Sequence, residues 1–210
     1  MHPIATVIPV KAHTLAYRQR LDSRRDELSQ HLHRILPGPQ PLVWEVGCGH
    51  GHFLTAYAEA HSTPLCVGID LANDRVTRAQ RKRDRSRSAH LHFLQADARL
   101  FLEVLPAGII FTEVFILFPD PWPKLRHRKH RLIQDDFLNA VALRSTAGTR
   151  LRFRTDHAPY FEEARGRIER HPQWTVLNEP WPFEHVTVFQ ARAAQHQSLT
   201  AGLRVAAAAP

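Results

Sequence analysis

The chain has 210 residues, of which 43% are hydrophobic and 23% are charged, and this composition is typical of a folded globular domain and excludes a wholly disordered chain. No apolar run approaches the roughly 18 residues that a membrane-spanning helix needs, so we expect no membrane span. The formal net charge of +8 suits a polyanionic partner such as nucleic acid, and a basic surface that only maintains solubility is an equally favoured alternative.

Residues 14–36 are predicted to form a helix, because leucine and isoleucine recur there at steps of three, four and seven residues. The sequence P-G-P-Q-P at 37–41 breaks this pattern and indicates a short linker. We therefore expect an N-terminal helical extension with its linker at 1–41, a main domain at 42–195 and a frayed tail at 196–210.

Strand and helix patterns alternate from residue 42 to about residue 171. The expected strands are 42–47, 65–70, 90–97, 113–118 and 149–156, and the expected helices are 51–61, 73–88, 98–105, 134–144 and 159–171. This alternation predicts an α/β fold with a parallel sheet that helices cover on both faces. Residues 174–179 and 185–192 are expected to form a closing pair of strands. Ligands of such sheets bind beyond the carboxyl ends of the strands.

The first predicted strand ends in a glycine-rich turn, E-V-G-C-G-H-G at 45–51. Gly47, Gly49 and Gly51 permit a tight turn and a close approach of the backbone to a ligand, although a purely structural turn is the alternative. The spacing is G-x-G-x-G, and His52 stands where the dinucleotide fingerprint has its third glycine. The turn therefore argues against a pyrophosphate and against NAD as the ligand.

Carboxylates stand at the ends of the first three predicted strands. Asp70 suits the two hydroxyls of a ribose and Asp97 suits an exocyclic amine such as that of adenine, with helix capping as the alternative for each. Glu45 lies inside an apolar strand, and a buried carboxylate needs a partner, which a cationic ligand group would provide. Together these residues suit a positively charged nucleoside without phosphate, and S-adenosylmethionine fits that description.

Residues 118–124 read F-P-D-P-W-P-K, and the three prolines exclude a regular strand or helix. The prolines restrict the backbone around Asp120, which would hold its carboxylate in place before a ligand binds. Trp122 offers a flat face on which a base could stack, and a rigid loop whose Trp122 fills the core is the alternative.

Basic side chains gather in three stretches. Arg126, Arg128, Lys129 and Arg131 directly follow the proline loop and favour contact with an RNA backbone over a merely solvated loop. Arg75, Arg78, Lys82 and Arg85 form a stripe on a predicted helix, for which RNA contact and a solvated face are equally favoured. Lys11, Arg18, Arg20, Arg24 and Arg25 are better explained as a solvated helix face.

With the glycine turn, F-P-D-P-W-P-K, R-H-R-K-H-R at 126–131 and T-D at 155–156, the chain resembles class I S-adenosylmethionine-dependent methyltransferases over about residues 42–192. More narrowly, it resembles the bacterial tRNA (guanine-N7)-methyltransferase family, whose signature is F-P-D-P-W-P-K-x-R-H. The resemblance implies a Rossmann-like domain with a seven-stranded, mostly parallel sheet and an antiparallel last strand. It also implies a cytoplasmic enzyme, a monomer or homodimer, that methylates N7 of a variable-loop guanine in tRNA.

The resemblance assigns roles to individual residues. It implies that the cofactor is held by Glu45, Gly47, Gly49, Gly51, Asp70, Asp97 and Asp120, and that Asp120 is the catalytic carboxylate. It implies that the substrate is contacted by Lys124, Asp156, Phe183 and Glu184, to which we add Trp122 as a stacking surface. The family's T-x-F-E motif is altered here to Trp181-Pro182-Phe183-Glu184. Two alternatives remain open: methylation of an exocyclic amine or another substrate, and a non-catalytic RNA-binding homologue.

The remaining residue patterns indicate no other catalytic chemistry. Cys48 and Cys66 fit no metal spacing and form no disulfide framework, which favours a reducing cytoplasm. The histidines form no H-x-x-x-H or H-E-x-x-H array, so we expect no metal. No serine lies in a nucleophile-elbow motif, and we expect no covalent nucleophile.

Overall fold

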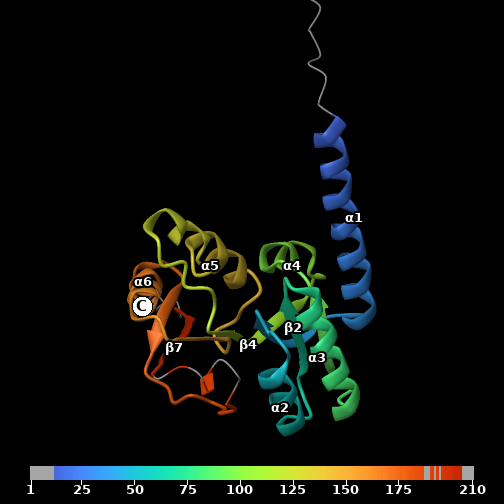
Figure 1. Ribbon diagram of the computed structural model, residues 1–210. Coiled ribbons are helices and arrows are strands. Elements are labelled where there is room, and N and C mark those ends of the chain that lie inside the picture. Colours follow the sequence, from blue (N-terminus) through green and yellow to red (C-terminus); the bar gives the residue numbers. More distant parts are fainter. Residues whose placement is uncertain (1–11, 187–189, 192, 194, 205–210) are drawn as a thin grey trace, which may run out of the picture.

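The computed structural model describes residues 12–186, 190, 191, 193 and 195–204. A seven-stranded sheet runs through this part of the chain in the order β3-β2-β1-β4-β5-β7-β6 (Figure 1). The strands are β1 (Gln40–Val46), β2 (Leu65–Asp70), β3 (Leu91–Gln95), β4 (Ile109–Leu117), β5 (Arg150–Thr155), β6 (Trp174–Leu177) and β7 (Gln197–Leu203). Neighbours from β3 to β5 are parallel, whereas β7 is antiparallel to β5 and β6. The predicted mostly parallel sheet with an antiparallel last strand is confirmed.

Helices cover both faces of the sheet, as the sequence predicts. They are α1 (Ala12–Ile35), α2 (His52–Ala60), α3 (Asn73–Ser86), α4 (Ala98–Val104), α5 (Asp135–Ala142) and α6 (Ala158–Arg170), and a 3-10 helix, η1 (Leu125–His130), follows the proline loop. Buried side chains of α1, α4, α5 and α6 pack on one face, and those of α2 and α3 pack on the other. Figure 1 shows α4 and α5 above the sheet and α2 and α3 below it.

Strand β1 carries Trp44, which with Trp174 is one of the two fully buried tryptophans among the described residues. Trp44 is fully buried, and its ring stacks on Phe101 of α4 at 4.9 Å and on Phe111 of β4 at 5.2 Å between centroids. On the opposite face of β1, Val43 packs in the cluster that includes Phe53 and Phe115. Because β1 is buried on both faces, its sequence is almost continuously apolar instead of alternating.

Strand β4 begins four residues before the predicted start at residue 113. The cause is a bulge against β1, where the register passes from Leu42 opposite Phe111 to Val43 opposite Glu113. Thr112 is the extra residue, and its hydroxyl donates to the carbonyl oxygen of Leu42 at 3.2 Å. A bulge shifts the side-chain alternation by one residue, which conceals the first part of the strand in the sequence.

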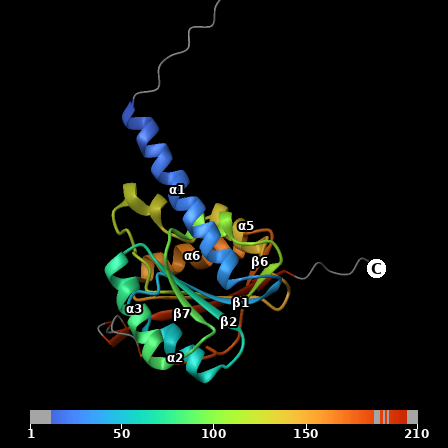
Figure 2. The ribbon, with the colours of Figure 1, turned by 90° about the vertical axis from the view of Figure 1, so that its right-hand side faces the viewer.

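The long helix α1 packs on the domain only near its end. Leu28, Leu32 and Leu36 are buried beside α4, whereas every residue from 19 to 27 is exposed. Figures 1 and 2 show the first half of α1 standing away from the body of the domain. Within the described residues, no helix combines the length and apolar character needed to cross a bilayer.

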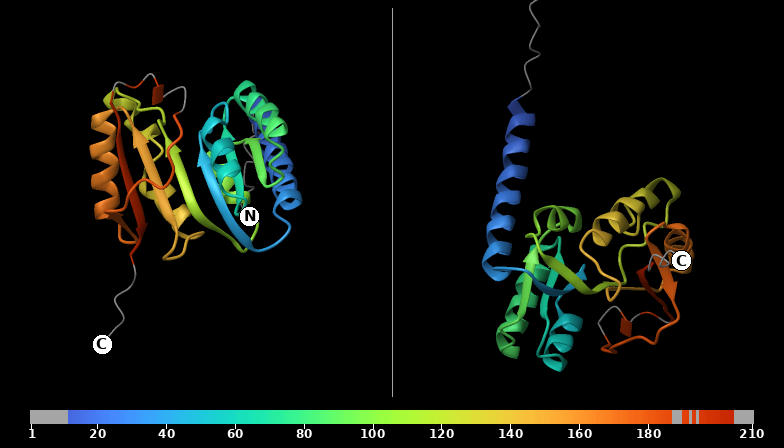
Figure 3. Two further views of the ribbon diagram at one scale, coloured as in Figure 1. Left: turned by 90° about the horizontal axis from the view of Figure 1, so that it is seen from below. Right: turned by 180° about the vertical axis from the view of Figure 1, so that it is seen from behind.

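Two expectations for the C-terminal region are wrong. Residues 197–203, which we expected to fray, form β7, which lies between β5 and β6 (Figure 3). The expected strand at 185–192 lies partly outside the described residues. Of its described residues, His185 and Val186 have no regular secondary structure, and Gln190 and Ala191 are helical. The sequence S-L-T-A-G-L has little β-branched or aromatic character, so β7 is stabilised by its two neighbouring strands and not by its own propensity.

The position of β7 can be tested with a matched pair of substitutions. Ala201 is fully buried opposite Leu151 and Val176, so Ala201→Asp should lower the free energy of unfolding by at least about 3 kcal/mol, because it buries an unpaired charge. Gln197→Asp, at the exposed start of the same strand, should have little effect. Urea denaturation measures both, and equal stabilities would contradict the assignment of β7.

Candidate functional site

The carboxyl ends of β2, β1 and β4 lie side by side at the point where the strand order reverses. In the parallel register, Val46 at the end of β1 pairs with Ile69 of β2 on one side and Ile116 of β4 on the other. The segments after these three strands therefore meet at one edge of the sheet. This topological switch point is where open α/β sheets bind ligands.

The glycine turn after β1 is fixed by backbone hydrogen bonds. The N–H groups of Gly47 and Cys48 both donate to the carbonyl oxygen of Ile69, at 2.8 and 2.9 Å. Gly47, Gly49 and Gly51 have φ values of 75°, 53° and 69°, in the left-handed region that favours glycine. A Cβ at Gly51 would lie 2.7 Å from Phe93, whereas a Cβ at Gly47 would meet no atom within 4 Å. The turn is thus packed at Gly51 and open to a ligand at Gly47.

Asp70 holds both the glycine turn and the start of α3. Its Oδ2 accepts a hydrogen bond from the N–H of Gly49 at 3.0 Å, and its Oδ1 accepts one from the N–H of Ala72 at 2.8 Å. The residue is only 6% exposed, and Arg75 lies 3.7 Å from Oδ2. Each carboxylate oxygen has a second lone pair, so this rigidly held group keeps acceptor capacity for a ligand.

Asp97 caps α4, so the capping alternative for this residue is confirmed. Its Oδ1 accepts hydrogen bonds from the N–H groups of Arg99 at 2.9 Å and Leu100 at 3.2 Å. Its Oδ2 has no hydrogen-bond partner among the residues that the structure describes, and the side chain is exposed. Capping and ligand binding are therefore compatible, because each uses a different oxygen.

Glu45 is a buried carboxylate without full compensation. It is 3% exposed, and its Oε2 has no hydrogen-bond partner within the described part of the chain. Burial raises the pKa of Glu45 to about 8, Asp70 adds to this effect, and a hydrogen bond with the Leu54 backbone acts in the opposite direction. A cationic ligand group nearby would supply the missing partner.

The loop at 118–124 has no regular secondary structure, as predicted from its prolines. Phe118 and Trp122 have φ values of 50° and 42°, which non-glycine residues rarely adopt. Asp120 lies midway between them, is exposed, and has no ion pair or hydrogen bond within the described residues. The N–H of Phe118 donates to the carbonyl oxygen of Arg154 at 2.8 Å, which ties the loop to β5.

Arg131, which we expected to contact RNA, instead supports this loop from within. Its side chain is fully buried, its Nε donates to the carbonyl oxygen of Pro121 at 2.8 Å, and its guanidinium donates to Glu163 at 2.6 Å. The guanidinium also lies 4.7 Å from the centre of the Tyr160 ring. The RNA-contact prediction for Arg131 is wrong, because a run of basic letters does not distinguish a buried guanidinium from an exposed one.

The other basic residues of the segment 126–131 remain candidates for contact with an RNA backbone. Arg126 and Lys129 are exposed and Arg128 is half-buried.

Trp122 is 37% exposed, and its ring lies 5.9 Å from that of His127 and 5.3 Å from that of His130. The alternative in which Trp122 fills the core is therefore wrong.

The altered C-terminal motif is built around an arginine of β5. Arg154 is 4% exposed, and its guanidinium lies 4.1 Å from the centre of the Trp181 ring. It donates to both carboxylate oxygens of Glu184, at 2.9 and 2.7 Å, and this pairing lowers the pKa of Glu184. Trp181 thus provides a stacking surface for Arg154.

Phe183 and Glu184 are already engaged within the chain. The Phe183 ring packs against Phe53 at 5.7 Å and against Tyr57 at 5.5 Å. Substrate contact by Phe183 or Glu184 stays a prediction. Lys124 and Asp156 are exposed, and among the described residues neither has an ion pair or a hydrogen bond from its side chain.

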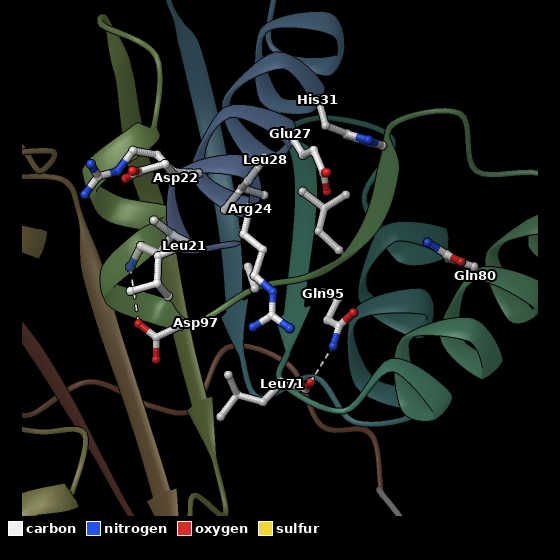
Figure 4. A pocket seen from close by; sticks show the side chains of 14 residues that line it. Leu21, Asp22, Arg24, Glu27, Leu28, His31, Leu71, Gln80, Gln95 and Asp97 are labelled. Carbon is white, nitrogen blue, oxygen red and sulfur yellow. Dashed lines mark hydrogen bonds between the residues drawn. The ribbon is translucent and has the colours of Figure 1, made fainter. Parts of the chain in front are cut away.

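Sequence reasoning missed one residue of this edge, Leu71. It directly follows Asp70, is 69% exposed, and lines a pocket of about 780 Å³ together with Asp97 and part of α1 (Figure 4). The available signal was a large apolar side chain placed just beyond the end of a buried strand. Glu163 and Tyr160, which support Arg131, gave no such signal, since they lie 32 and 29 residues further along the chain.

Known proteins of one family match this chain. A family model described as "Putative methyltransferase" matches residues 39–200. A tRNA (guanine-N(7)-)-methyltransferase of Thermus thermophilus is 32% identical over 162 residues, which make up 74% of this chain and 52% of that protein. One of Thermosynechococcus vestitus is 30% identical over 189 residues, covering 85% of this chain and 86% of that protein. The chain belongs to the bacterial tRNA (guanine-N7)-methyltransferase family.

The fold of this chain agrees with that of a solved structure. TrmN from Thermus thermophilus superposes with a TM-score of 0.57 at 18% identity, over 84% of this chain and 48% of that chain. This likeness supports the Rossmann-like fold alone. The chain spans about half the length of the Thermus thermophilus relative, at 52%, and most of the Thermosynechococcus vestitus relative, at 86%.

The edge of the sheet suits S-adenosylmethionine, the cofactor that the family resemblance implies. The open space at Gly47, the free oxygen of Asp97 and the unpartnered oxygen of Glu45 fit a ligand with hydrogen-bond donors and a positive charge. Among the described residues, no group of three or more histidine, cysteine or acidic side chains is placed to hold a metal ion.

The raised pKa of Glu45 predicts a specific pH dependence of stability. Between a pH of about 4.5 and 8 the folded chain keeps a proton on Glu45 that the unfolded chain loses, so stability should fall as the pH rises. The slope should be at most about 1.4 kcal/mol per pH unit, and Glu45→Gln should remove it. Urea unfolding of ligand-free protein at several pH values measures this, with Glu103→Gln as an exposed control. If the free energy of unfolding changes with pH in parallel for wild type and Glu45→Gln, the Glu45 carboxylate already has its hydrogen-bond partners and the prediction is wrong.

The support of the proline loop by Arg131 can be tested without an activity assay. Arg131→Lys keeps the charge but loses the planar fork, so the non-proline amides of 118–124 should exchange about tenfold faster or more, since a hydrogen bond from a charged group contributes roughly 1.5–3 kcal/mol. Arg126→Lys, in the same segment but exposed, is the control. Hydrogen exchange read by mass spectrometry gives the result. Equal exchange in both variants would mean that Arg131 does not hold the loop.

Proposed function

We propose that this chain transfers a methyl group from S-adenosylmethionine to N7 of a guanine in tRNA. The observation that carries the proposal is the exposed, unpartnered carboxylate of Asp120, on a loop tied to β5 and to Arg131 at the switch point of the sheet. The names of the relatives supply the substrate class. By family resemblance we assign the target to the variable loop and the enzyme to the cytoplasm.

The cofactor would span the ends of the first three strands. In this proposal Asp70 would accept hydrogen bonds from the ribose hydroxyls, and the free Oδ2 of Asp97 would accept one from the adenine amine. Glu45 would face the cationic methionine end of the cofactor. The open side of the turn at Gly47 leaves room for the ligand to approach the backbone. We infer these contacts from unfilled acceptor positions that lie along one edge of the sheet.

The chemistry needs little acid–base assistance. Guanine N7 is an unprotonated lone pair, so its attack on the methyl carbon requires no proton removal. The carbon–sulfur bond breaks as the carbon–nitrogen bond forms, the sulfonium becomes a neutral thioether, and the positive charge passes to the guanine. Asp120 would stabilise this charge from a fixed position, so that catalysis is mostly positioning and electrostatics.

The substrate half of the site lies around the proline loop. Trp122 would stack the target guanine, while Lys124 and Asp156 would contact the nucleotide. Arg126, Arg128 and Lys129 on η1 would bind phosphates of the RNA backbone. Arg131 is excluded from this set by its burial.

Replacement of Asp120 tests the proposed role most directly. Asp120→Ala should lower methyl transfer by about 10²–10³-fold, the usual effect of removing one preorganised electrostatic group, while cofactor affinity changes little. The assay follows label from S-adenosylmethionine into unmodified tRNA transcripts and detects strand scission at N7-methylguanine. Asp84→Asn, on the exposed face of α3, is the control.

Each other outcome has a definite meaning. Unchanged turnover of Asp120→Ala would remove Asp120 from the mechanism. Label on an exocyclic amine would keep a methyltransferase but overturn the N7 assignment. If the wild-type protein binds tRNA and the cofactor yet transfers no label, the chain is a non-catalytic RNA-binding homologue and the proposed function is wrong.

A further inference from the structure

The pocket of about 780 Å³ lies between α1 and the carboxyl ends of β2 and β3. Half of the residues that line it belong to α1, and these are Leu21, Asp22, Arg24, Arg25, Glu27, Leu28 and His31. The opposite side includes Leu71 after β2 and Asp97 after β3, next to the position proposed for the adenosine of the cofactor. We propose that α1 is the outer wall of the adenine subsite, with Leu21 and Arg24 as its contact residues. This inference rests on the proposed cofactor site.

Two leucines give the pocket uncovered apolar surfaces. Leu71 is 69% exposed and Leu21 is 45% exposed, although both line the same pocket. The backbone at Leu71 is fixed, because its carbonyl oxygen accepts a hydrogen bond from Gln95 Nε2 at 2.9 Å and the next residue donates to Asp70. A flat aromatic ligand between the two leucines would remove both apolar surfaces from water, which is favourable.

Arg24 brings an unpaired cation into the same space. Figure 4 shows its guanidinium reaching from α1 into the pocket, between Asp97 and Gln95 and above Leu71. Within the described residues Arg24 has no ion pair or hydrogen bond, whereas its neighbour Arg25 pairs with Glu103 at 2.5 Å. A planar guanidinium stacks well on an aromatic ring, so Arg24 suits the face of an adenine whose amine points to Asp97.

The packing of α1 sets the distance of this wall from the sheet. Leu28 and Leu32 are buried against the domain about two and three turns after Leu21. The Arg25–Glu103 ion pair joins α1 to α4. Among the described side chains of residues 19–27, this ion pair is the one polar contact with the rest of the domain. As a wall of the cofactor pocket, this part of α1 would have a function that a merely solvated helix face lacks.

Calorimetric titration of the purified full-length protein measures ligand affinity and so tests whether α1 contacts the adenine. The probes are S-adenosylhomocysteine and 5′-methylthioadenosine, which share the nucleoside but differ in the amino-acid group. Arg24→Ala should weaken both about five- to thirtyfold, and Leu21→Ala should also weaken both. Arg20→Ala, exposed on the same helix outside the pocket, should leave both affinities within twofold.

The comparison with Asp70→Ala separates this inference from the cofactor site itself. One outcome is that Asp70→Ala loses binding of the probes while Arg24→Ala and Leu21→Ala bind them as well as the control Arg20→Ala does. In that case α1 is not a wall of the adenine subsite, and the proposed cofactor site stands. If Arg24→Ala weakens only S-adenosylhomocysteine, Arg24 acts on the carboxylate of the ligand and the adenine assignment is overturned. If the wild-type protein binds neither probe, the proposed cofactor site falls together with the wall.

Discussion

The carbonyl oxygen of Ile69 and the carboxylate of Asp70 hold the glycine turn against the end of β2, and the geometry of the site depends on this connection. Two consecutive N–H groups, of Gly47 and Cys48, donate to the Ile69 carbonyl, and the N–H of Gly49 donates to Asp70. The turn that follows β1 is thereby fixed to the neighbouring strand. Three left-handed glycines make this path possible without strain.

The same edge of the sheet keeps several groups in states that are unfavourable without a ligand. Glu45 is buried with an unpartnered oxygen, Leu71 is an exposed leucine, and Phe118 and Trp122 adopt left-handed backbone conformations. Such features concentrate at functional sites, where surrounding contacts compensate for them. Here the compensation includes the stacked core around Trp44, which fixes β1, α4 and β4 relative to one another.

Arginine has two distinct functions in this strongly basic chain. Arg131 and Arg154 are buried, and each pairs with a glutamate while supporting the proline loop or the C-terminal motif, respectively. A buried guanidinium is tolerable only when such partners compensate for its lost hydration. The exposed residues Arg126 and Lys129 remain available to a polyanion. Net charge alone therefore overstates the surface that can bind RNA.

The sequence alone determined the fold class and which candidate residues follow the ends of the parallel strands. Alternating strand and helix patterns specify a parallel sheet, and Gly47, Asp70, Asp97 and Asp120 follow strand ends that this topology must bring together. These inferences succeed because side-chain periodicity and turn chemistry are local properties of the chain.

Only the tertiary structure decided features that depend on long-range contacts. The strand β7 is stable because β5 and β6 flank it, and the buried state of Arg131 depends on Glu163 and Tyr160. The pocket wall of α1 depends on how three leucines of the N-terminal segment pack on the domain. None of these contacts has a local signature, because the residues that create each environment are far apart in the chain.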